Sequence, residues 1–281
     1  MSPENRVILW VDGAIRDPAE PVVRATDHGL TVGDGVFEAC ELLDGRPFAL
    51  TRHLERLERS AEGLGLPAPN RDEVSKAVDA VAAAWGDELA RVRILWTAGE
   101  GPLGTDAAWG PGTLVVAATA VGVPRAVRVA VVPWVRNERS AIAGLKTTSY
   151  AENVRALAWA KAHGADEAIF ANTRGELCEG TGTNIFLERD GALLTPPLTS
   201  GCLAGVTRAV VIEWAREDGI EVREDALDLA ELDGAAHVGL TSSTKGMVPV
   251  VAVDGRPIEP GPLTGRIGEV YARRHVLERD P

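Results

Sequence analysis

Hydrophobic and polar positions in the first third of the chain follow two periods, one typical of strands and one typical of amphipathic helices. The apolar run at 7–11 ends at Asp12-Gly13, which predicts a strand and a hairpin turn. Apolar residues recur every three or four positions at 54–64 and again at 74–85, which predicts two helices that each bury one face. Further strands are expected at 35–43, 91–97 and 113–120.

The pattern loosens into Val-Gly-Val-Pro after residue 120, which indicates a domain boundary. We expect a small N-terminal domain at 1–120, a linker at 121–126 and a large domain at 127–281. Because tight turns join several of the strands, we expect largely antiparallel sheets in two α+β domains. The elements expected in the large domain are helices at about 149–163 and 205–218, strands at 127–132, 221–223, 237–240 and 248–253, and hairpins at 167–194.

Charge and composition narrow the classes of function. The 281 residues include 29 Lys and Arg against 41 Asp and Glu, a net charge of −12, which disfavours nucleic acid and anionic membrane surfaces as partners. Three widely separated cysteines fit reduced thiols in a cytoplasm. Residues 1–5 are polar and no apolar run approaches the roughly 18 residues of a membrane span, so we expect a cytoplasmic protein.

Common catalytic motifs are missing or lack their context. The five histidines show no metal-ligand spacing, and no G-x-S-x-G elbow indicates a hydrolase. Residues 99–104 fit G-x-G-x-x-G, but Pro102 lies inside the motif and no helix pattern follows it. A dinucleotide phosphate would then have no helix N-terminus to bind, so we expect neither a metal nor a dinucleotide.

Four short segments carry candidate chemistry, each a weak signal by itself. Lys146 lies between an expected strand and an expected helix, where a desolvated amine has a lowered pKa and can form a Schiff base. Glu179 precedes a glycine turn that leads into an apolar strand, which can hold a carboxylate at a pocket. The helix start at 205–208 and the hydroxyl cluster at 241–244 could each bind a phosphate through backbone N–H groups.

Taken together, these segments resemble the class IV aminotransferases, the fold type IV enzymes that depend on pyridoxal phosphate. The resemblance covers nearly the whole chain, and the 33 residues from Lys146 to Glu179 match the interval that the family uses. The family includes branched-chain and D-amino-acid aminotransferases, (R)-amine transaminases and 4-amino-4-deoxychorismate lyase. The motifs that carry it are Gly33-Asp-Gly-Val-Phe-Glu38, His53-Leu-x-Arg56-Leu57, Lys146 with Tyr150, Glu179-Gly-x-Gly-x-Asn184-Ile-Phe, Leu194-Thr-Pro-Pro, Leu203-x-Gly205-Val206-Thr207-Arg208 and Ser243-Thr244 before Pro249.

The resemblance implies an α+β fold like that of D-amino-acid aminotransferase, with a small α/β sandwich domain and a larger pseudo-barrel domain that binds pyridoxal 5′-phosphate. It also implies that Lys146 binds the cofactor covalently and later moves the α-proton of the substrate. Glu179 would keep the ring nitrogen protonated, so that the ring acts as an electron sink. Tyr150 would hydrogen-bond the ring oxygen. The residues implied to hold the phosphate are Arg56, Gly205, Val206, Thr207, Ser243 and Thr244. From its helical spacing alone, Arg56 would instead be assigned to a solvated face.

The substrate side is less well specified. Phe37 of the glycine-rich motif is expected to contact the substrate. Arg91 and Arg93 alternate with Val92 on an expected strand, so both project to one face, either as a solvated pair or with at least one binding a substrate carboxylate. D-amino-acid enzymes carry an Arg-x-His in the following loop, which is replaced here by residues 103–105.

One departure from the family bears on the reaction. The chorismate-derived lyases carry a threonine where this chain has Ala39, and alanine has no proton to transfer. We therefore predict a ping-pong transfer of an amino group to a 2-oxo acid, with a D-amino acid or (R)-amine favoured as donor because the glycine-rich motif is short and the chain compact. 4-Amino-4-deoxychorismate lyase, a branched-chain L-amino-acid aminotransferase and a cofactor carrier without transamination stay open as alternatives. Since members of the family are dimers, we expect a homodimer.

Overall fold

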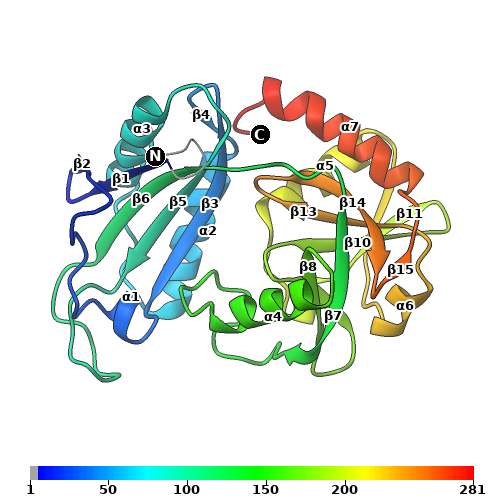
Figure 1. The fold of residues 1–281 in the computed structure, drawn as a ribbon, viewed down its shortest axis with the longest axis horizontal. Coiled ribbons are helices and arrows are strands. Elements are labelled where there is room, and N and C mark those ends of the chain that lie inside the picture. Colours follow the sequence, from blue (N-terminus) through cyan, green and yellow to red (C-terminus); the bar gives the residue numbers. More distant parts are fainter. Residues whose placement is uncertain (1–5) are drawn as a thin grey trace. The chain divides into compact units, whose positions relative to one another are not determined.

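The structure is a computed structural model that describes residues 6–281. Residues 1–5, the polar segment in which the sequence shows no apolar targeting run, lie outside the described residues. The chain divides into two compact units (Figure 1). The first comprises the chain up to Gly122 together with Leu145–Tyr150 and Arg279–Pro281, and the second comprises Val123–Gly144 and Ala151–Glu278. No sequence pattern had indicated that the segment with Lys146 belongs to the first unit.

The first unit is a six-stranded sheet covered on one face by two helices. The strand order is β2-β1-β6-β5-β3-β4, and every neighbouring pair is antiparallel, as expected. Helices α2 and α3 pack their apolar stripes on the sheet, with Leu54 and Val78 in the same buried cluster as Val36. The strands are β1 (Val7–Val11), β2 (Ala14–Arg16), β3 (Gly35–Leu43), β4 (Arg46–Pro47), β5 (Ala90–Thr97) and β6 (Thr113–Ala120), and the helices are α1 (His28–Thr31), α2 (Leu50–Leu64) and α3 (Arg71–Trp85).

Helix α2 buries polar residues as well as apolar ones. His53, Arg56 and Ser60 are buried together with Leu54 and Leu57. The apolar spacing in the sequence predicted the helix and its buried leucines. It did not predict the polar members of the buried face, because their partners come from distant parts of the chain.

The second unit is built on a nine-stranded mixed sheet, in the order β12-β11-β10-β13-β14-β7-β8-β9 with β15 beside β14. Apolar residues from strands along the whole sheet meet in one buried core, including Val129, Leu177, Ile185 and Val250, which requires the sheet to curl around it. The strands are β7 (Val127–Arg136), β8 (Glu167–Asn172), β9 (Leu177–Gly180), β10 (Asn184–Arg189), β11 (Ala192–Thr195), β12 (Glu221–Glu224), β13 (Val238–Ser242), β14 (Gly246–Val253) and β15 (Arg256–Pro257).

The sheets are largely antiparallel, as predicted, and the helices of the second unit explain its parallel exceptions. The pairs β7–β8, β7–β14 and β11–β12 are parallel. Helix α4 lies in the chain between β7 and β8, and α5 lies between β11 and β12, and such long connections allow parallel neighbours. The helices are α4 (Ala151–Ala162), α5 (Val206–Glu217), α6 (Leu229–Gly234), α7 (Pro262–Leu277) and the 3-10 turn η2 (Leu198–Ser200).

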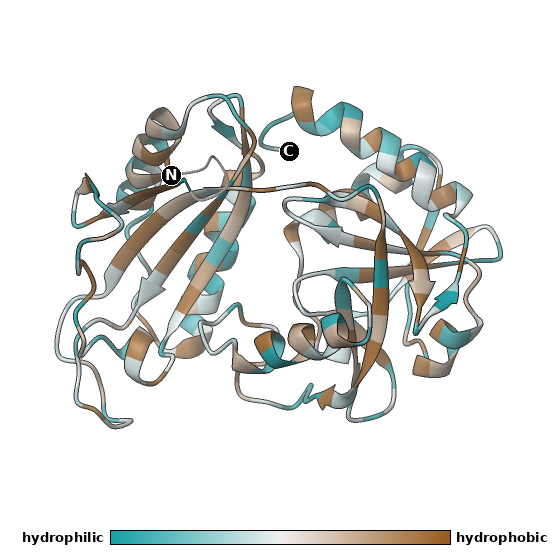
Figure 2. Cartoon of the chain, viewed as in Figure 1, coloured by the Kyte–Doolittle hydropathy of each residue, from teal (hydrophilic) through white to brown (hydrophobic). Residues whose placement is uncertain are grey.

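Hydropathy follows this arrangement in both units. Figure 2 shows hydrophobic residues concentrated along the strands, whereas α7 alternates between hydrophobic and hydrophilic positions. None of the helices found in residues 6–281 is both long enough and apolar enough to span a membrane. The mixed α+β architecture with two curled sheets confirms the predicted fold class.

Candidate active site

Lys146 lies against the edge of the first unit's sheet, beside β3. Its carbonyl accepts a hydrogen bond from the Phe37 amide at 2.9 Å, and its own amide donates to the Ser60 hydroxyl at 3.2 Å. The next residue, Thr147, forms an antiparallel bridge with Val36. Strand β3 and helix α2 therefore fix the backbone on both sides of this lysine.

The Phe37 ring brings four of the predicted site residues together. The Lys146 Nζ lies 4.3 Å from the ring centroid and the Arg93 Cζ lies 3.9 Å from it. The Tyr150 ring meets the same ring edge-on, with centroids 5.2 Å apart. Because the electron-rich face of an aromatic ring attracts cations, Phe37 positions both the amine and the guanidinium.

The two arginines of β5 have different environments. Val92 points into the core, Arg91 is exposed and Arg93 is partly buried. Among residues 6–281, Arg93 has no ion pair with a carboxylate. Burial is the main influence that lowers the pKa of Arg93; Tyr150 opposes it and Arg91 adds to it. Of the two side chains, Arg91 is solvated, whereas Arg93 is partly buried over the Phe37 ring.

On the other face of β3, Glu38 forms a buried charge network with α2. Its Oε1 and Oε2 accept hydrogen bonds from Arg56 Nε and Nη2, both at 2.7 Å, and Oε2 lies 2.6 Å from His53 Nδ1. Burial alone would raise the pKa of the Glu38 carboxyl, but Arg56 and His53 hold it below its ordinary value. The assignment of Arg56 to a solvated face is therefore wrong, because an acid on a neighbouring strand draws it inward.

In the second unit, Glu179 is held on β9 by the loop before α5. Its Oε2 accepts a hydrogen bond from the Leu203 amide at 2.9 Å, and the Asn184 side chain donates to the Leu203 carbonyl at 2.9 Å. The Glu179 side chain is 13% exposed. The orientation of this carboxylate is therefore fixed by backbone groups on a short loop.

Arg136, at the end of β7, is a site residue that the sequence analysis missed. Its Nε lies 3.5 Å from Glu179 Oε1, and its Nη1 donates to Glu152 at 2.8 Å and to Asn153 at 3.0 Å. The guanidinium lies over the Phe170 ring at 4.4 Å. Nothing in the sequence spacing links residues 136 and 179, since β8 lies between their strands and pairs with both in an irregular register.

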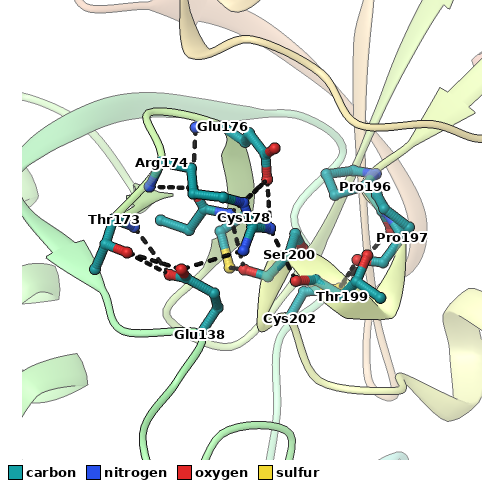
Figure 3. A network of polar contacts seen from close by, with 11 residues as sticks. Glu138, Thr173, Arg174, Glu176, Cys178, Pro196, Pro197, Thr199, Ser200 and Cys202 are labelled. Carbon is teal, nitrogen blue, oxygen red and sulfur yellow. Dashed lines mark hydrogen bonds and ion pairs between the residues drawn. The ribbon is translucent and has the colours of Figure 1, made fainter.

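A polar network holds the start of β9 and the turn before it (Figure 3). Arg174 pairs with Glu138 at 3.1 Å and Glu176 at 2.6 Å and donates to the Thr199 carbonyl at 2.9 Å. Cys178, next to Glu179, donates its thiol to the Ser200 carbonyl at 3.3 Å. The hairpin before Glu179 and the loop that leads to Leu203 are thereby tied to each other.

Helix α5 begins without a side-chain cap. Its N-cap is Gly205, and a Cβ there would lie 2.0 Å from Asn184 Oδ1, so only glycine fits without a shift. In the part of the chain that the structure describes, the buried hydroxyl of Thr207 in the first turn has no hydrogen-bond partner, and neither do those of Thr241 and Ser242 on β13. Uncapped N–H groups and unsatisfied hydroxyls suit an anion.

Comparison with known proteins decides the family. The family model described as Amino-transferase class IV matches residues 35–253. This chain is a class IV aminotransferase. It is 34% identical over 278 residues to a putative branched-chain-amino-acid aminotransferase of Methanocaldococcus jannaschii, with 94% of each chain covered.

Two further similarities broaden the picture of this aminotransferase. It is 31% identical over 303 residues to a bifunctional aminodeoxychorismate lyase / D-amino acid transaminase of Mycobacterium tuberculosis, which covers 97% of this chain and 100% of that protein. The crystal structure of a branched-chain aminotransferase from Thermoproteus uzoniensis with norvaline superposes with a TM-score of 0.89, at 33% identity, covering 97% of this chain and 95% of that one. The predicted family, fold type and enzyme class are confirmed.

Class IV aminotransferases use pyridoxal phosphate, and the residues of this chain fit it. In the second unit, the uncapped start of α5 and the buried Thr207 hydroxyl suit a phosphate, and the Glu179 carboxylate suits a protonated ring nitrogen. In the first unit, the Lys146 amine suits an aldehyde. No cluster of three or more metal-ligating side chains occurs among residues 6–281.

Proposed function

We propose that the enzyme transfers the amino group of an amino acid to a 2-oxo acid in two half-reactions at one site. The observation that carries this proposal is the Arg93 guanidinium, which shares the Phe37 ring with the Lys146 amine and has no carboxylate partner among the described residues. A cation and an amine held on one aromatic ring suit a substrate that carries a carboxylate next to its amino group.

Each residue of the site has a role in this proposal. Bound pyridoxal phosphate supplies a ring that accepts the electron pair left when the α-proton departs. Lys146 takes that proton and returns it, and Glu179, oriented by the Leu203 amide, holds the proton on the ring nitrogen. Tyr150 donates to the ring oxygen. The phosphate ligands in this proposal are Arg56, Gly205, Val206, Thr207, Ser243 and Thr244.

The donor we propose is a branched-chain L-amino acid. The relatives named as branched-chain aminotransferases support it. An (R)-amine has no carboxylate and would leave Arg93 without a partner, so the geometry favours an amino acid over an amine. The preference for a D-amino acid drawn from the motif is not confirmed; a D-amino acid is the second candidate, supported by the name of the Mycobacterium tuberculosis relative.

The lyase alternative is disfavoured at Ala39. This residue pairs with Arg93 in the register of β3 and β5, so it lies on the strand face that also carries Phe37. The position therefore belongs to the candidate site, and its methyl group has no proton to deliver. Supplying 4-amino-4-deoxychorismate should yield no 4-aminobenzoate beyond a blank.

We propose further that the enzyme is a cytoplasmic homodimer. The three cysteines are all free thiols, as a reducing compartment requires. In the first unit, Leu30, Leu103 and Trp109 are exposed by 68%, 79% and 73%. Large apolar side chains exposed to this extent suit a surface that a second copy of the chain covers.

A half-reaction panel tests the function. The holoenzyme is mixed with L-leucine, L-valine, D-alanine or each enantiomer of 1-phenylethylamine, and the visible absorbance of the bound cofactor is followed. We expect the L-amino acids to bleach the absorbance and 2-oxoglutarate to restore it. Bleaching only by D-alanine would select the second candidate, and no bleaching by any amine would indicate a carrier.

A lysine substitution tests the covalent attachment. Only Lys76, Lys146, Lys161 and Lys245 are present, so each can be replaced separately. Lys146→Ala should abolish the covalent attachment that borohydride reduction traps, whereas Lys161→Ala on α4 should keep it. Attachment to another lysine in Lys146→Ala would refute the assignment.

A further inference from the structure

One buried nitrogen of helix α2 has no hydrogen-bond partner among residues 6–281. His53 is 0% exposed and its Nδ1 lies 2.6 Å from Glu38 Oε2, yet its buried Nε2 meets no hydrogen-bond partner among residues 6–281. Leaving a buried polar atom unsatisfied costs free energy, and such atoms in native proteins usually meet a ligand or water. The position of His53 on its helix shows which ligand it could meet.

Helix α2 turns one polar face toward Glu38 and Lys146. His53, Arg56 and Ser60 are spaced by three and four residues, so they lie on the same side of the helix. Arg56 contacts Glu38, and the Ser60 hydroxyl accepts from the Lys146 amide. The Lys146 charge also acts on the imidazole. His53 therefore lies on the same side of α2 as Ser60, which contacts the Lys146 backbone, and within range of the Lys146 charge.

The protonation of His53 follows from its neighbours. Glu38 is an ionised acceptor, so Nδ1 carries a proton and donates it. Burial is the main cause that lowers the pKa of His53; Glu38 of β3 opposes this effect, and Arg56 of α2 and Lys146 of the 145–150 segment add to it. At neutral pH the imidazole ring is neutral, and Nε2 is then a hydrogen-bond acceptor that meets no donor among residues 6–281.

The charge balance changes when a phosphate arrives. Glu38 already engages Nε and Nη2 of Arg56, so this ion pair is neutral as a unit. A phosphate monoester brings nearly two negative charges at neutral pH. A proton on Nε2 would supply a compensating positive charge and turn the unsatisfied acceptor into a charge-assisted donor.

We propose that His53 is a ligand of the cofactor's phosphate group and that its Nε2 takes up one proton from solvent when the phosphate binds. The proposal rests on the proposed function, because it takes the Lys146 segment as the cofactor site. It adds a phosphate ligand that also links cofactor binding to pH. Above the pH at which the bound-state imidazole loses its proton, the affinity for the phosphate should fall.

Nuclear magnetic resonance of the wild-type protein tests proton uptake directly. Apoenzyme labelled with ¹⁵N-histidine is titrated over pH with and without pyridoxine 5′-phosphate, which carries the phosphate but has no aldehyde to react with Lys146. We expect His53 Nε2 to be unprotonated at pH 7.5 in the apoenzyme and protonated with the ligand, more than about a tenfold rise in its proton affinity. An unchanged His53 signal would overturn the proposal.

A matched pair of variants tests the contact. His53→Gln should weaken pyridoxine 5′-phosphate binding by about tenfold and flatten its pH dependence, whereas His163→Gln, on an exposed turn after α4, should change neither. Equal affinity and equal pH dependence in His53→Gln would also overturn the proposal. If amino transfer fails in the panel but His53 still gains its proton, the reaction assignment fails and this inference stands. If amino transfer is observed but His53 gains no proton, only this inference fails.

Discussion

Arg91 and Arg93 lie two positions apart on β5, so substitutions at the two positions can be compared directly. Arg93→Gln removes the cation beside Lys146 but keeps a polar side chain over Phe37. Because a hydrogen bond to a charged group contributes about 1.5–3 kcal/mol, we expect KM for the amino acid to rise about 10- to 100-fold. Steady-state kinetics measures this rise.

Arg91→Gln is the control, since Arg91 is exposed on the same strand. It should leave KM within about twofold of the wild type, as expected for a surface change. Equal effects of the two substitutions on KM would show that Arg93 acts only through its positive charge at long range and does not bind the carboxylate.

Glu38 links the stability of the first unit to pH. Glu38→Gln leaves Arg56 buried without its charge partner, which should cost about 3–5 kcal/mol of unfolding free energy. Glu58 lies on the exposed side of α2 and pairs with Arg71 of α3. Glu58→Gln removes this ion pair and should cost less than about 1 kcal/mol of unfolding free energy. Urea unfolding at pH 7.5 measures both, and similar losses would contradict the buried network.

The direction of the pH effect follows from the two depressed pKa values. The folded pKa of Glu38 lies below its unfolded value of about 4.3, so its contribution is present above that pH and is lost as the pH falls further. The pKa of buried His53 is also lowered, so the unfolded chain takes up its proton first, from about pH 6.5 downward. The unfolding free energy of the apoenzyme should fall in two steps between pH 7.5 and pH 3, and the upper step should be missing in His53→Gln.

The sequence predicts the proposed roles of the site residues better than it predicts their contact partners. The roles proposed for Lys146, Glu179 and the phosphate segments come from the order and spacing of motifs that resemble those of the family. The partner of Arg56 was not predictable. It depends on the side of β3 that faces α2, and this face is set by packing across 18 residues of sequence.

At the scale of elements, the start of α5 has its present form because Gly205 has no Cβ. Gly205→Ala would place a Cβ 2.0 Å from Asn184 Oδ1, and Asn184 holds Leu203, whose amide holds Glu179. We expect the substitution to disturb both the uncapped helix start and the carboxylate, and to weaken cofactor binding by about tenfold or more. Fluorescence titration of apoenzyme with pyridoxal phosphate measures this loss.

Gly182→Ala is the matched control. A Cβ at this position has no heavy atom within 4 Å, although the residue lies in the motif that contains Glu179 and Asn184. Cofactor affinity should stay near that of the wild type. A similar loss in both variants would mean that alanine acts through the flexibility of the backbone and not through Asn184.

Element types were predictable where one periodic pattern governs a segment. The helices expected at 149–163 and 205–218 are α4 and α5, with ends within two residues of those predicted. The pairing of strands was less predictable, because the hydrophobic pattern of a strand does not indicate which strand lies next to it in the sheet. The parallel pairs of the second unit arise from chain crossovers, and the extension of β7 to Arg136 depends on an irregular register with β8.

At the scale of the whole molecule, the division of the chain differs from a simple cut in the sequence. Segment 145–150 belongs to the first unit because it bonds β3 and α2, through Phe37, Val36 and Ser60. A loosened pattern, like the one that predicts a linker at 121–126, can suggest a boundary, but a short return of the chain leaves no such pattern. Lys146 lies on this return, so its unit could be found only from contacts.

Assembly is the last property at this scale that the surface allows us to predict. Leu30 lies on α1, and Leu103 and Trp109 lie on the loop between β5 and β6. The two segments are joined, since Asp27 bridges Glu100 and the His28 ring bonds the Pro102 carbonyl at 2.8 Å. Three exposed apolar side chains on joined segments suit contact with a second copy, because isolated ones would be ordinary but grouped ones mark an interface.

Sedimentation equilibrium tests this assembly. The holoenzyme at micromolar concentration should behave as twice the 29.7 kDa chain, and Trp109→Asp with Leu103→Asp should shift it toward the monomer, because a buried carboxylate without a partner opposes association. Leu277→Asp is the control, since Leu277 is 78% exposed at the end of α7 in the second unit. A wild-type monomer would refute the dimer, whereas a dimer unaffected by the double substitution would place its interface on another surface of the chain.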